Sequence, residues 1–348
     1  MTSNSRYDVG SSSNPSPPLT ESKNYIGEKA KQILATRQVE EIANLVTKLC
    51  YGKETKETEE SSKLLYKSFT KHFPKVLSKK LFQLYRLAPV TPKIRSFALT
   101  LLDSLLIDLE DSRFDWNTES LKHIKTHLTA CLVEQETSDH DFKLLSRIVS
   151  RVAVDIFINN ISWDELLAYM LSLNQNKRLL LIFSDLPMVL DEEFLIPLLE
   201  DDLHLKIISG LLSSDSEDEE WCLAFGAGFS LILQLVNLEK KDLVWDLVYV
   251  VVHSVREMVN VKRREIVVRK GFMKLVKKVR REAMRFREAE YEVVSRLALM
   301  LKSVNGVCEA TEMAAKMIHE VLDRYYMGGE ALDLALINQS LEMLKSCK

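Results

Sequence analysis

The chain has 348 residues, of which 46% are hydrophobic and 28% charged, and its net charge at pH 7 is −3. This balance is typical of a folded protein and excludes a largely disordered chain. The near-neutral total argues against attraction of the whole chain to nucleic acid or to an acidic membrane surface. Five cysteines lie far apart without a CxxC pair, so we expect buried free thiols in a reducing compartment, cytoplasmic or nuclear.

Residues that form turns are scarce in this chain. No glycine occurs between Gly52 and Gly210, and no proline follows Pro197. Strands need turns at short intervals, and turns draw heavily on glycine and proline. The sequence therefore predicts an all-α fold.

The first 22 residues are rich in Ser, Asn and Pro and contain no apolar run of the kind that a secretory signal needs. We expect residues 1–22 to be a disordered tail. Helical periodicity begins after them, which predicts an α-helical repeat domain over 23–348.

A helical hairpin is predicted where the chain passes through its central prolines. Pro74 opens a segment whose apolar residues recur at three-and-four spacing up to Ala88. A proline suits the first turn of a helix because its missing N–H would have no partner there. Pro89 and Pro92 then break the chain before a second apolar stripe, so we expect two antiparallel helices.

This unit recurs along the chain. Hairpin starts are predicted near Pro74, Thr118 and Ser162, 44 residues apart each time. Trp116 and Trp163 each precede an acidic residue and a leucine, which is typical of a helix start with an aromatic staple, and we expect both to be buried. A period in the forties is typical of HEAT and armadillo repeats, with the clearest register over 74–260.

The most apolar part of the chain is predicted to be core rather than membrane. Residues 222–236 are shorter than the roughly 18 apolar residues of a membrane-spanning helix, and an acidic run precedes them. Segments 229–236 and 244–252 are apolar all round, so we expect both inside a stacked array. Gly226 and Gly228 are expected to let a neighbouring helix approach closely.

Two segments resemble HEAT repeats. ISWDELLAYML, at 161–171, looks like the opening of repeats of the importin-β type, and TPKIRSFALTLLDSLL, at 91–106, resembles the second helix of a HEAT unit, with Arg95 and Ala98 at family-typical places. As a whole, the chain resembles a plant-specific family assigned to the ARM/HEAT superfamily. The resemblance implies an ARM/HEAT-type α-solenoid of stacked antiparallel helix pairs that binds protein along a curved surface, with no catalytic residue.

No motif of the sequence points to an enzyme, a cofactor or a metal. His123 and His127 lie one helical turn apart, but no glutamate of the HExxH kind accompanies them, so two surface histidines are expected. The glycines at 226–228 lie in an apolar helix and fit neither the dinucleotide nor the P-loop pattern. We therefore expect no catalytic activity, no cofactor and no metal site.

Charge is distributed unevenly along the chain. Eleven acidic residues and one lysine lie between Asp191 and Glu220, whereas thirteen Lys and Arg against four Glu lie between Arg256 and Glu288. The basic section predicts an amphipathic helix over 262–287, with an apolar stripe of Ile266, Phe272, Met273, Val276, Val279 and Ala283. Its expected exposed, partner-binding residues are Lys262, Arg263, Arg264, Arg269, Lys270, Lys274, Lys277, Lys278, Arg280 and Arg281.

Three interpretations of this basic helix stay open. It is a solvated face, a docking surface for an acidic partner, or a nuclear-import signal built from KRR at 262–264 and KKVRR at 277–281. The acidic stretch at 191–220 is expected to be solvated, although pairing of 215–220 with the basic helix would mask it.

The sequence favours a non-enzymatic protein–protein interaction scaffold without a membrane partner. The alternatives are a karyopherin-like nuclear transport adaptor and nucleic-acid binding through the basic helix 262–287. Salt distinguishes the last from the others, because phosphate binding by several cations weakens steeply as salt rises.

Overall fold

The computed structural model describes residues 28, 30–35, 39–52, 56–87, 89–111, 116–134, 137–188, 190–213, 218–260 and 265–346. Over these residues the secondary structure is helical and contains no strand, which confirms the prediction of an all-α fold. The tail predicted over residues 1–22 lies outside this range, and so does Cys347.

The chain divides into two compact units, residues 1–105 and 106–348. Unit 1 contains α2 (Glu40–Tyr51), α3 (Lys56–His72), α4 (Pro74–Tyr85) and the first part of α5 (Pro92–Asp111). Arg95 links the end of α4 to the start of α5, since its Nε donates to the carbonyl of Tyr85 at 2.5 Å and its guanidinium lies over the Tyr85 ring. Ala98 is buried.

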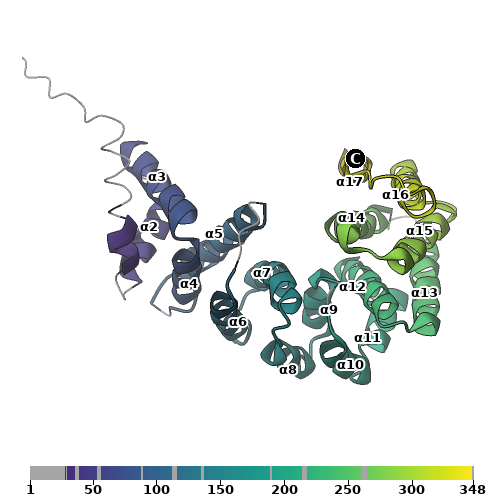
Figure 1. The fold of residues 1–348 in the computed structure, drawn as a ribbon, viewed down its shortest axis with the longest axis horizontal. Helices are drawn as coiled ribbons and strands as arrows, with labels where there is room; N and C mark the ends of the chain where they lie inside the picture. The colour runs from purple at the N-terminus through teal and green to yellow at the C-terminus, as the bar shows by residue number, and fades with distance from the viewer. Residues whose placement is uncertain are drawn as a thin grey trace, which may run out of the picture. The chain divides into compact units, whose positions relative to one another are not determined.

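Unit 2 contains the end of α5 and the helices that follow it (Figure 1). These are α6 (Thr118–Leu132), α7 (Asp139–Ile158), α8 (Asp164–Ser172), α9 (Asn176–Asp185), α10 (Glu192–Glu200), α11 (Leu203–Leu212), α12 (Asp218–Asn237), α13 (Lys241–Asn260), α14 (Glu265–Glu282), the short 3-10 helix η1 (Ala283–Arg285), α15 (Glu288–Lys302), α16 (Glu309–Gly328) and α17 (Leu334–Ser346).

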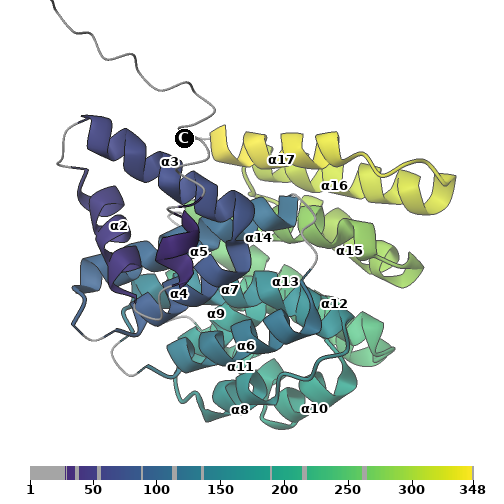
Figure 2. The same ribbon diagram turned by 60° about the vertical axis from the view of Figure 1, so that its left-hand side comes forward.

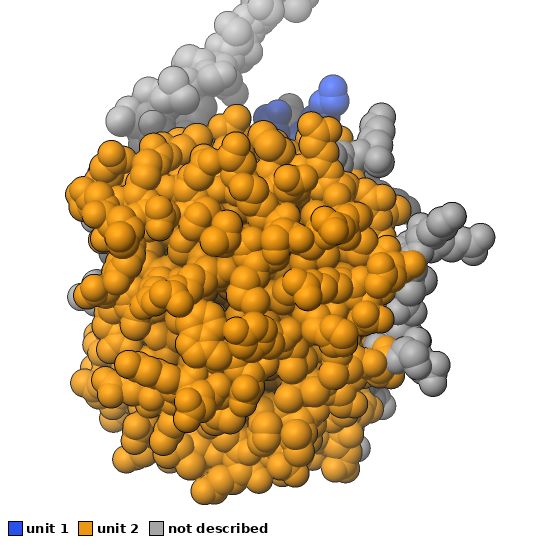
Figure 3. All heavy atoms as spheres, turned by 90° about the vertical axis from the view of Figure 1, so that its right-hand side faces the viewer, with its two compact units in different colours: residues 1–105 blue, residues 106–348 orange. Residues whose placement is uncertain are grey.

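The helices of unit 2 pack in two rows. In one row α7, α9, α12, α14 and α17 each contact the next, and in the other α6, α8, α10, α11, α13, α15 and α16 do so. Contacts such as those of α6 with α7 and of α12 with α13 join the rows, and Figure 2 shows α16 and α17 running side by side. We call the row that begins with α7 the inner row and the row that begins with α6 the outer row. Figure 3 shows the side-chain surface of unit 2 from the side where α13, α15 and α16 lie in Figure 1.

Both tryptophans that mark the predicted repeats are buried, as expected. Trp163 lies just before α8, and its Nε1 donates to Oγ1 of Thr129 on α6 at 2.9 Å. Trp116 lies just before Asn117, whose side chain caps α6 by accepting a hydrogen bond from the N–H of Ser120. In both places the aromatic ring anchors a helix start in the core.

Helix α12 is the core of unit 2. Its side chains from Trp221 to Val236 are buried except at Gly226, because α9, α11, α13 and α14 surround it. Its length and apolarity would suffice to cross a membrane, yet it packs inside the protein, which confirms the prediction of a buried core helix.

The expectation that 244–252 is buried all round is wrong. Val244, Val248 and Val251 of α13 are buried, but Tyr249 is 62% exposed. Helix α13 belongs to the outer row, so only one of its faces meets α11, α12 and α14. The many valines of this segment suggested burial on all sides, whereas the helix is amphipathic.

Small residues set the spacing of helices around α12. A Cβ on Gly210 would lie 2.8 Å from Cβ of Ala224, so α11 and α12 approach at a distance that no larger residue would allow. At Gly226 and Gly228 the nearest side chains of neighbouring helices would lie 3.3–3.4 Å from a Cβ. The close approach predicted for this glycine pair is confirmed.

The cysteines follow the sequence prediction in part. Cys131 and Cys222 are buried, whereas Cys50 and Cys308 are only half-buried. Cys50 lies at the end of α2 and Cys308 is the residue before α16, and helix ends cover less of a side chain than helix middles do.

Candidate functional site

The basic section forms two elements instead of the single helix predicted over 262–287. Helix α14 ends at Glu282, η1 follows, and Phe286 is extended before Arg287, the residue that precedes α15. The reason is the start of α15, where the backbone N–H of Arg287 donates to Oε2 of buried Glu290 at 2.9 Å.

The apolar face of α14 is rotated from the predicted stripe. Phe272, Val276 and Val279 are buried as expected, whereas Ile266 is 55% exposed and Met273 is half-buried. Gly271 explains the rotation, since a Cβ there would lie 2.8 Å from the Trp221 ring. The helix therefore rests on α12 through its glycine, and Val267 and Val268 join the buried face.

The ten predicted binding residues differ in exposure. Lys270, Lys277 and Arg280 are exposed, Arg269, Lys274 and Arg281 are half-buried, and Lys262, Arg263 and Arg264 lie outside the described residues. The prediction that Lys278 is exposed is wrong, because only 7% of it is accessible. Full exposure of Arg269, Lys274 and Arg281 is wrong as well.

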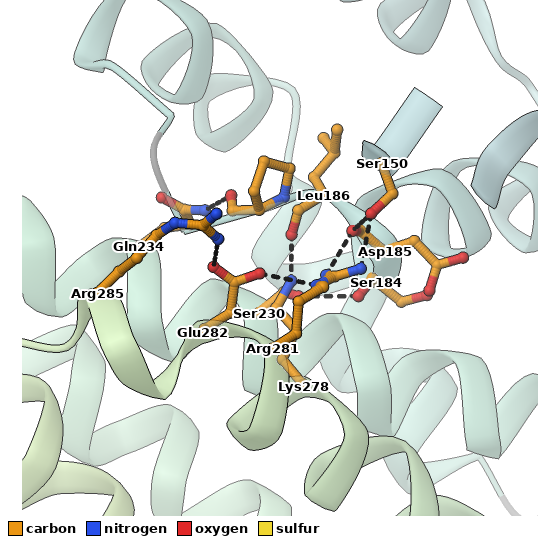
Figure 4. A network of polar contacts seen from close by, with 11 residues as sticks. Ser150, Ser184, Asp185, Leu186, Ser230, Gln234, Lys278, Arg281, Glu282 and Arg285 are labelled. Atoms are coloured by element: carbon orange, nitrogen blue, oxygen red, sulfur yellow. Dashed lines mark hydrogen bonds and ion pairs between the residues drawn. The ribbon is translucent and has the colours of Figure 1, made fainter. Parts of the chain in front are cut away.

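Lys278 and Arg281 are drawn inward by the end of α9. The last carbonyls of a helix have no partner within it, and a buried carbonyl without a hydrogen bond is costly. Here the free carbonyls are those of residues 184–187, and side chains from three helices bond to them (Figure 4). We call this cluster the α9 end network; its side-chain donors are Ser150, Ser230, Gln234, Lys278 and Arg281.

The geometry of the α9 end network is specific. Ser230 Oγ donates to the carbonyl of Ser184 at 3.0 Å, and Gln234 Nε2 donates to that of Pro187 at 2.5 Å. Arg281 Nη2 donates to the carbonyl of Asp185 at 2.8 Å while its Nη1 donates to Ser150 Oγ at 2.7 Å. Lys278 Nζ donates to the carbonyl of Leu186.

Electrostatics also favour this arrangement. The C-terminal end of a helix carries partial negative charge, so cations are stabilised there. Buried Glu282 compensates further, since its carboxylate accepts from Arg281 Nε at 2.8 Å and from Arg285 Nη1 at 3.2 Å. Burial alone would raise the pKa of Glu282, but the charges of Lys278, Arg281 and Arg285 outweigh it and hold the pKa below its usual value.

Lys278 remains under electrostatic stress in this position. Burial lowers its pKa to about 7, and the charge of Arg281 acts in the same direction against Glu282 and Asp185. A further negative charge nearby would therefore stabilise its ammonium group.

Next to the network lies a cavity of about 430 Å³, which we call the inner cavity. Helices α7, α9, α12 and α14 form its walls. Six basic side chains and one carboxylate, that of Asp185, line it together with apolar and small residues. The basic ones are Arg147, Arg151, Lys274, Lys277, Lys278 and Arg281.

A second cavity of about 610 Å³, the outer cavity, shares Arg147, Asp185, Lys274 and Lys277 with the inner one. Its wall is more apolar, and its lining includes Leu181, Cys222, Leu223, Val267 and Met273. Burial raises the pKa of the Cys222 thiol, so this sulfur behaves as a small apolar group.

Two rows of cations line these cavities, and we call the space between them the basic groove. Lys143, Arg147 and Arg151 follow one face of α7 at four-residue spacing, and Lys270, Lys274, Lys277 and Arg281 follow one face of α14. The row on α14 was predicted. The row on α7 was missed, although the four-residue spacing of Lys143, Arg147 and Arg151 is visible in FKLLSRIVSRV at 142–152.

The acidic stretch meets the groove at one end only. Glu219 pairs with Lys143 of α7 and, at 2.7 Å, with Lys177 of α9, and these two hydrogen bonds lower its pKa to about 2. Residues 214–217 lie outside the described range. Pairing of Glu219 with α14, as the masking hypothesis required, is not what the structure shows.

The histidine pair lies away from the groove on α6. His123 is exposed and 3.9 Å from Glu119, and His127 is half-buried. Across the part of the chain that the structure describes, no group of three or more His, Cys, Asp or Glu residues is arranged to hold a metal ion.

Residues 121–289 match a family model described as a repeat of unknown function (DUF577). The match extends from α6 into α15 and includes every residue of the basic groove. No curated protein matches the chain. Among solved structures, a crystal structure of an engineered protein aligns over 97% of both chains at 12% identity, with a TM-score of 0.34. The family match supports the repeat nature of residues 121–289.

Proposed function

We propose that this protein is a non-enzymatic interaction scaffold whose unit 2 is an ARM/HEAT-type α-solenoid. The packing of helices in two linked rows supports the proposal, because stacking of helix pairs is how such repeats bury their apolar stripes. The family match to a repeat supports it too. Cytoplasmic or nuclear location remains a prediction.

The basic groove is the proposed docking surface, and its occupant is an acidic segment of a partner protein. The observation that carries this proposal is the pair of facing cationic rows on α7 and α14 in a chain whose net charge is negative. Complementary charge speeds encounter and selects the partner. Cavities beneath the rows add places for side chains to enter.

Nucleic-acid binding fits the groove less well. Sequence-tolerant binding of single strands uses aromatic side chains as stacking platforms. Among the described residues lining the two cavities, Phe229 is the single aromatic, and it is buried. Asp218 and Glu219 at one end would also repel a continuous phosphate backbone.

The nuclear-import interpretation is also weakened. A receptor must reach the side chains of a basic signal, but Lys278 of KKVRR is buried and Arg281 is half-buried in the α9 end network. A karyopherin-like adaptor remains the alternative, and it would use the same groove.

The test is binding of acidic peptides to the full chain. We expect a fluorescent library with fixed Asp and Glu positions to bind, and the double variant Lys270→Glu, Lys277→Glu to bind at least about tenfold more weakly. Arg256→Glu, Arg280→Glu is the matched control, since both residues are exposed and line neither cavity. Equal binding by the two double variants would contradict the groove as docking surface.

A further inference from the structure

We propose that the inner cavity is a phosphate-binding subsite of the basic groove, and that it takes the phosphoryl group of a phosphorylated serine or threonine in the partner. This inference rests on the proposed function and adds the chemistry that the groove selects.

The inner cavity holds positive charge that no described residue pairs with. Six cations line it against the carboxylate of Asp185, and two of them, Lys274 and Lys277, make no ion pair with any described residue. A glutamate side chain brings a single charge, whereas a phosphate monoester brings about −1.5 to −2 and three strong acceptor oxygens. A phosphoryl group therefore neutralises more of the cavity and satisfies more of its donors than an acidic side chain does.

Two of the cations are fixed before any ligand arrives. Lys278 and Arg281 are anchored to the carbonyls at the end of α9, and Glu282 holds Arg281 from the other side. Donors held in place by other bonds lose little conformational freedom when an anion binds. The α9 end network thus forms a rigid wall of the proposed subsite.

Two further cations retain their donors for a ligand. Lys274 and Lys277 make no hydrogen bond and no ion pair with any residue that the structure describes. Gly226 makes room for Lys274, since a Cβ there would lie 3.4 Å from Cδ of the lysine. The lysine stem can therefore lie over α12.

The position of Lys274 also creates a need for an anion. Its burial lowers its pKa, although Asp185 and Glu219 oppose this effect. A half-buried ammonium group without a bonded counter-charge is costly, and a bound anion removes that cost. A phosphoryl group bound in the inner cavity would supply this counter-charge.

The outer cavity extends the specificity to the neighbouring residue. Because it shares Lys274 and Lys277 with the inner cavity but has an apolar wall, it suits an apolar side chain close to the phosphorylated residue. Met273 in this wall is flexible and polarizable, so it adapts to side chains of different shape. We expect a ligand motif of a phosphorylated residue beside an apolar one.

The experiment compares three fluorescent peptide libraries that differ at one fixed central position: phosphoserine, serine or glutamate, among random residues enriched in Asp and Glu. Anisotropy with the full chain should give about tenfold tighter binding for phosphoserine than for glutamate. Inorganic phosphate should compete more strongly with the phosphoserine library than with the serine library.

Variants locate the effect. Lys274→Gln with Lys277→Gln should remove the preference for phosphoserine, while Arg256→Gln with Arg280→Gln should keep it. Since Lys274 is half-buried, thermal melts accompany the measurement, and exposed Lys277→Gln alone should reduce the preference without lowering the melting temperature.

Each outcome decides between the two proposals. Equal binding of the three libraries, weakened alike by the lysine variants, would overturn the phosphate subsite and leave the acidic docking groove in place. Absence of binding by all three libraries would overturn both. Binding of a single-stranded RNA in place of the peptides, with steep salt dependence, would also overturn both.

Discussion

Helix α14 has two cationic faces with different surroundings. On one face Lys278 is buried and bonded to the carbonyl of Leu186, and buried Glu282 lies one turn further along the helix. On the other, Lys270 and Lys277 are exposed and bonded to no described residue. The same residue types, within eleven positions of one helix, therefore serve stability in one place and are available for binding in the other.

The difference comes from what each face meets. Carbonyls at a buried helix end must be satisfied, so cations that reach them become part of the core. Cations over a cavity meet no such demand. Counting basic residues on a helix thus overestimates its binding surface unless the ends of neighbouring helices are taken into account.

The largest effect is expected at the centre of the bonded face. Glu282→Gln should lower the free energy of unfolding by about 3 kcal/mol, because removing one partner leaves buried cations uncompensated. Chemical denaturation measures it. Exposed Glu265→Gln on the same helix is the control and should change stability by less than about 0.5 kcal/mol. Similar values for the two variants would show that the faces do not differ.

Overpacking of α14 against α12 should follow in size. Gly271→Ala places a methyl group against the Trp221 and Phe225 rings and should cost about 2 kcal/mol, even though alanine favours helix more than glycine does. Lys270→Ala, one position away on the exposed side, should leave the melting temperature nearly unchanged. A stabilised Gly271→Ala variant would mean that the helices can move apart freely.

The pH dependence of stability isolates Lys278. Its pKa is about 7 in the folded chain and near 10.5 in the unfolded one, so above pH ~7 the unfolded chain binds more protons and stability rises with pH. Between pH ~6.5 and ~8.5 the wild type should gain about 1–2 kcal/mol relative to Lys278→Met. The comparison ends at pH ~8.5 because burial raises the pKa of the Cys222 thiol, and titration of this thiol changes stability at higher pH. Parallel stability curves for the two proteins would contradict a buried, destabilised ammonium group.

The smallest effect on stability is expected on the exposed face. Lys277→Gln should change the free energy of unfolding by less than about 0.5 kcal/mol while it weakens binding of acidic peptides. Denaturation and anisotropy on the same preparation separate the two properties. A loss of stability together with binding would place Lys277 among the bonded cations.

The helices could be predicted from local patterns. These patterns, namely scarce glycine and proline, the marking prolines and the two tryptophans, each depend on neighbours in sequence. Helices do begin at Pro74 and Thr118, and both tryptophans are buried. The exposure of Tyr249 could not be predicted in this way, because a helix of the outer row and a helix of the inner row can contain the same run of valines.

The site was predictable in part for a related reason. The basic row of α14 is visible in the sequence, but the inward turn of Lys278 depends on carbonyls at 184–187, about 90 residues earlier. Likewise, the sequence does not reveal that Gly271 is needed for close packing of α14 on α12, because this need comes from the Trp221 ring beside it. Features set by contacts between distant segments leave no local signal.

The α9 end network has a mechanical consequence for unit 2. Stacked helices bend by small rotations at each junction, and a junction held by apolar side chains alone can slide, because such contacts have no fixed direction. Hydrogen bonds do have direction, and here they tie α7, α12 and α14 to a single point at the end of α9. We therefore expect unit 2 to be stiffest where α7, α12 and α14 meet the end of α9. Bending of unit 2 should occur mainly in the helices on either side of this junction.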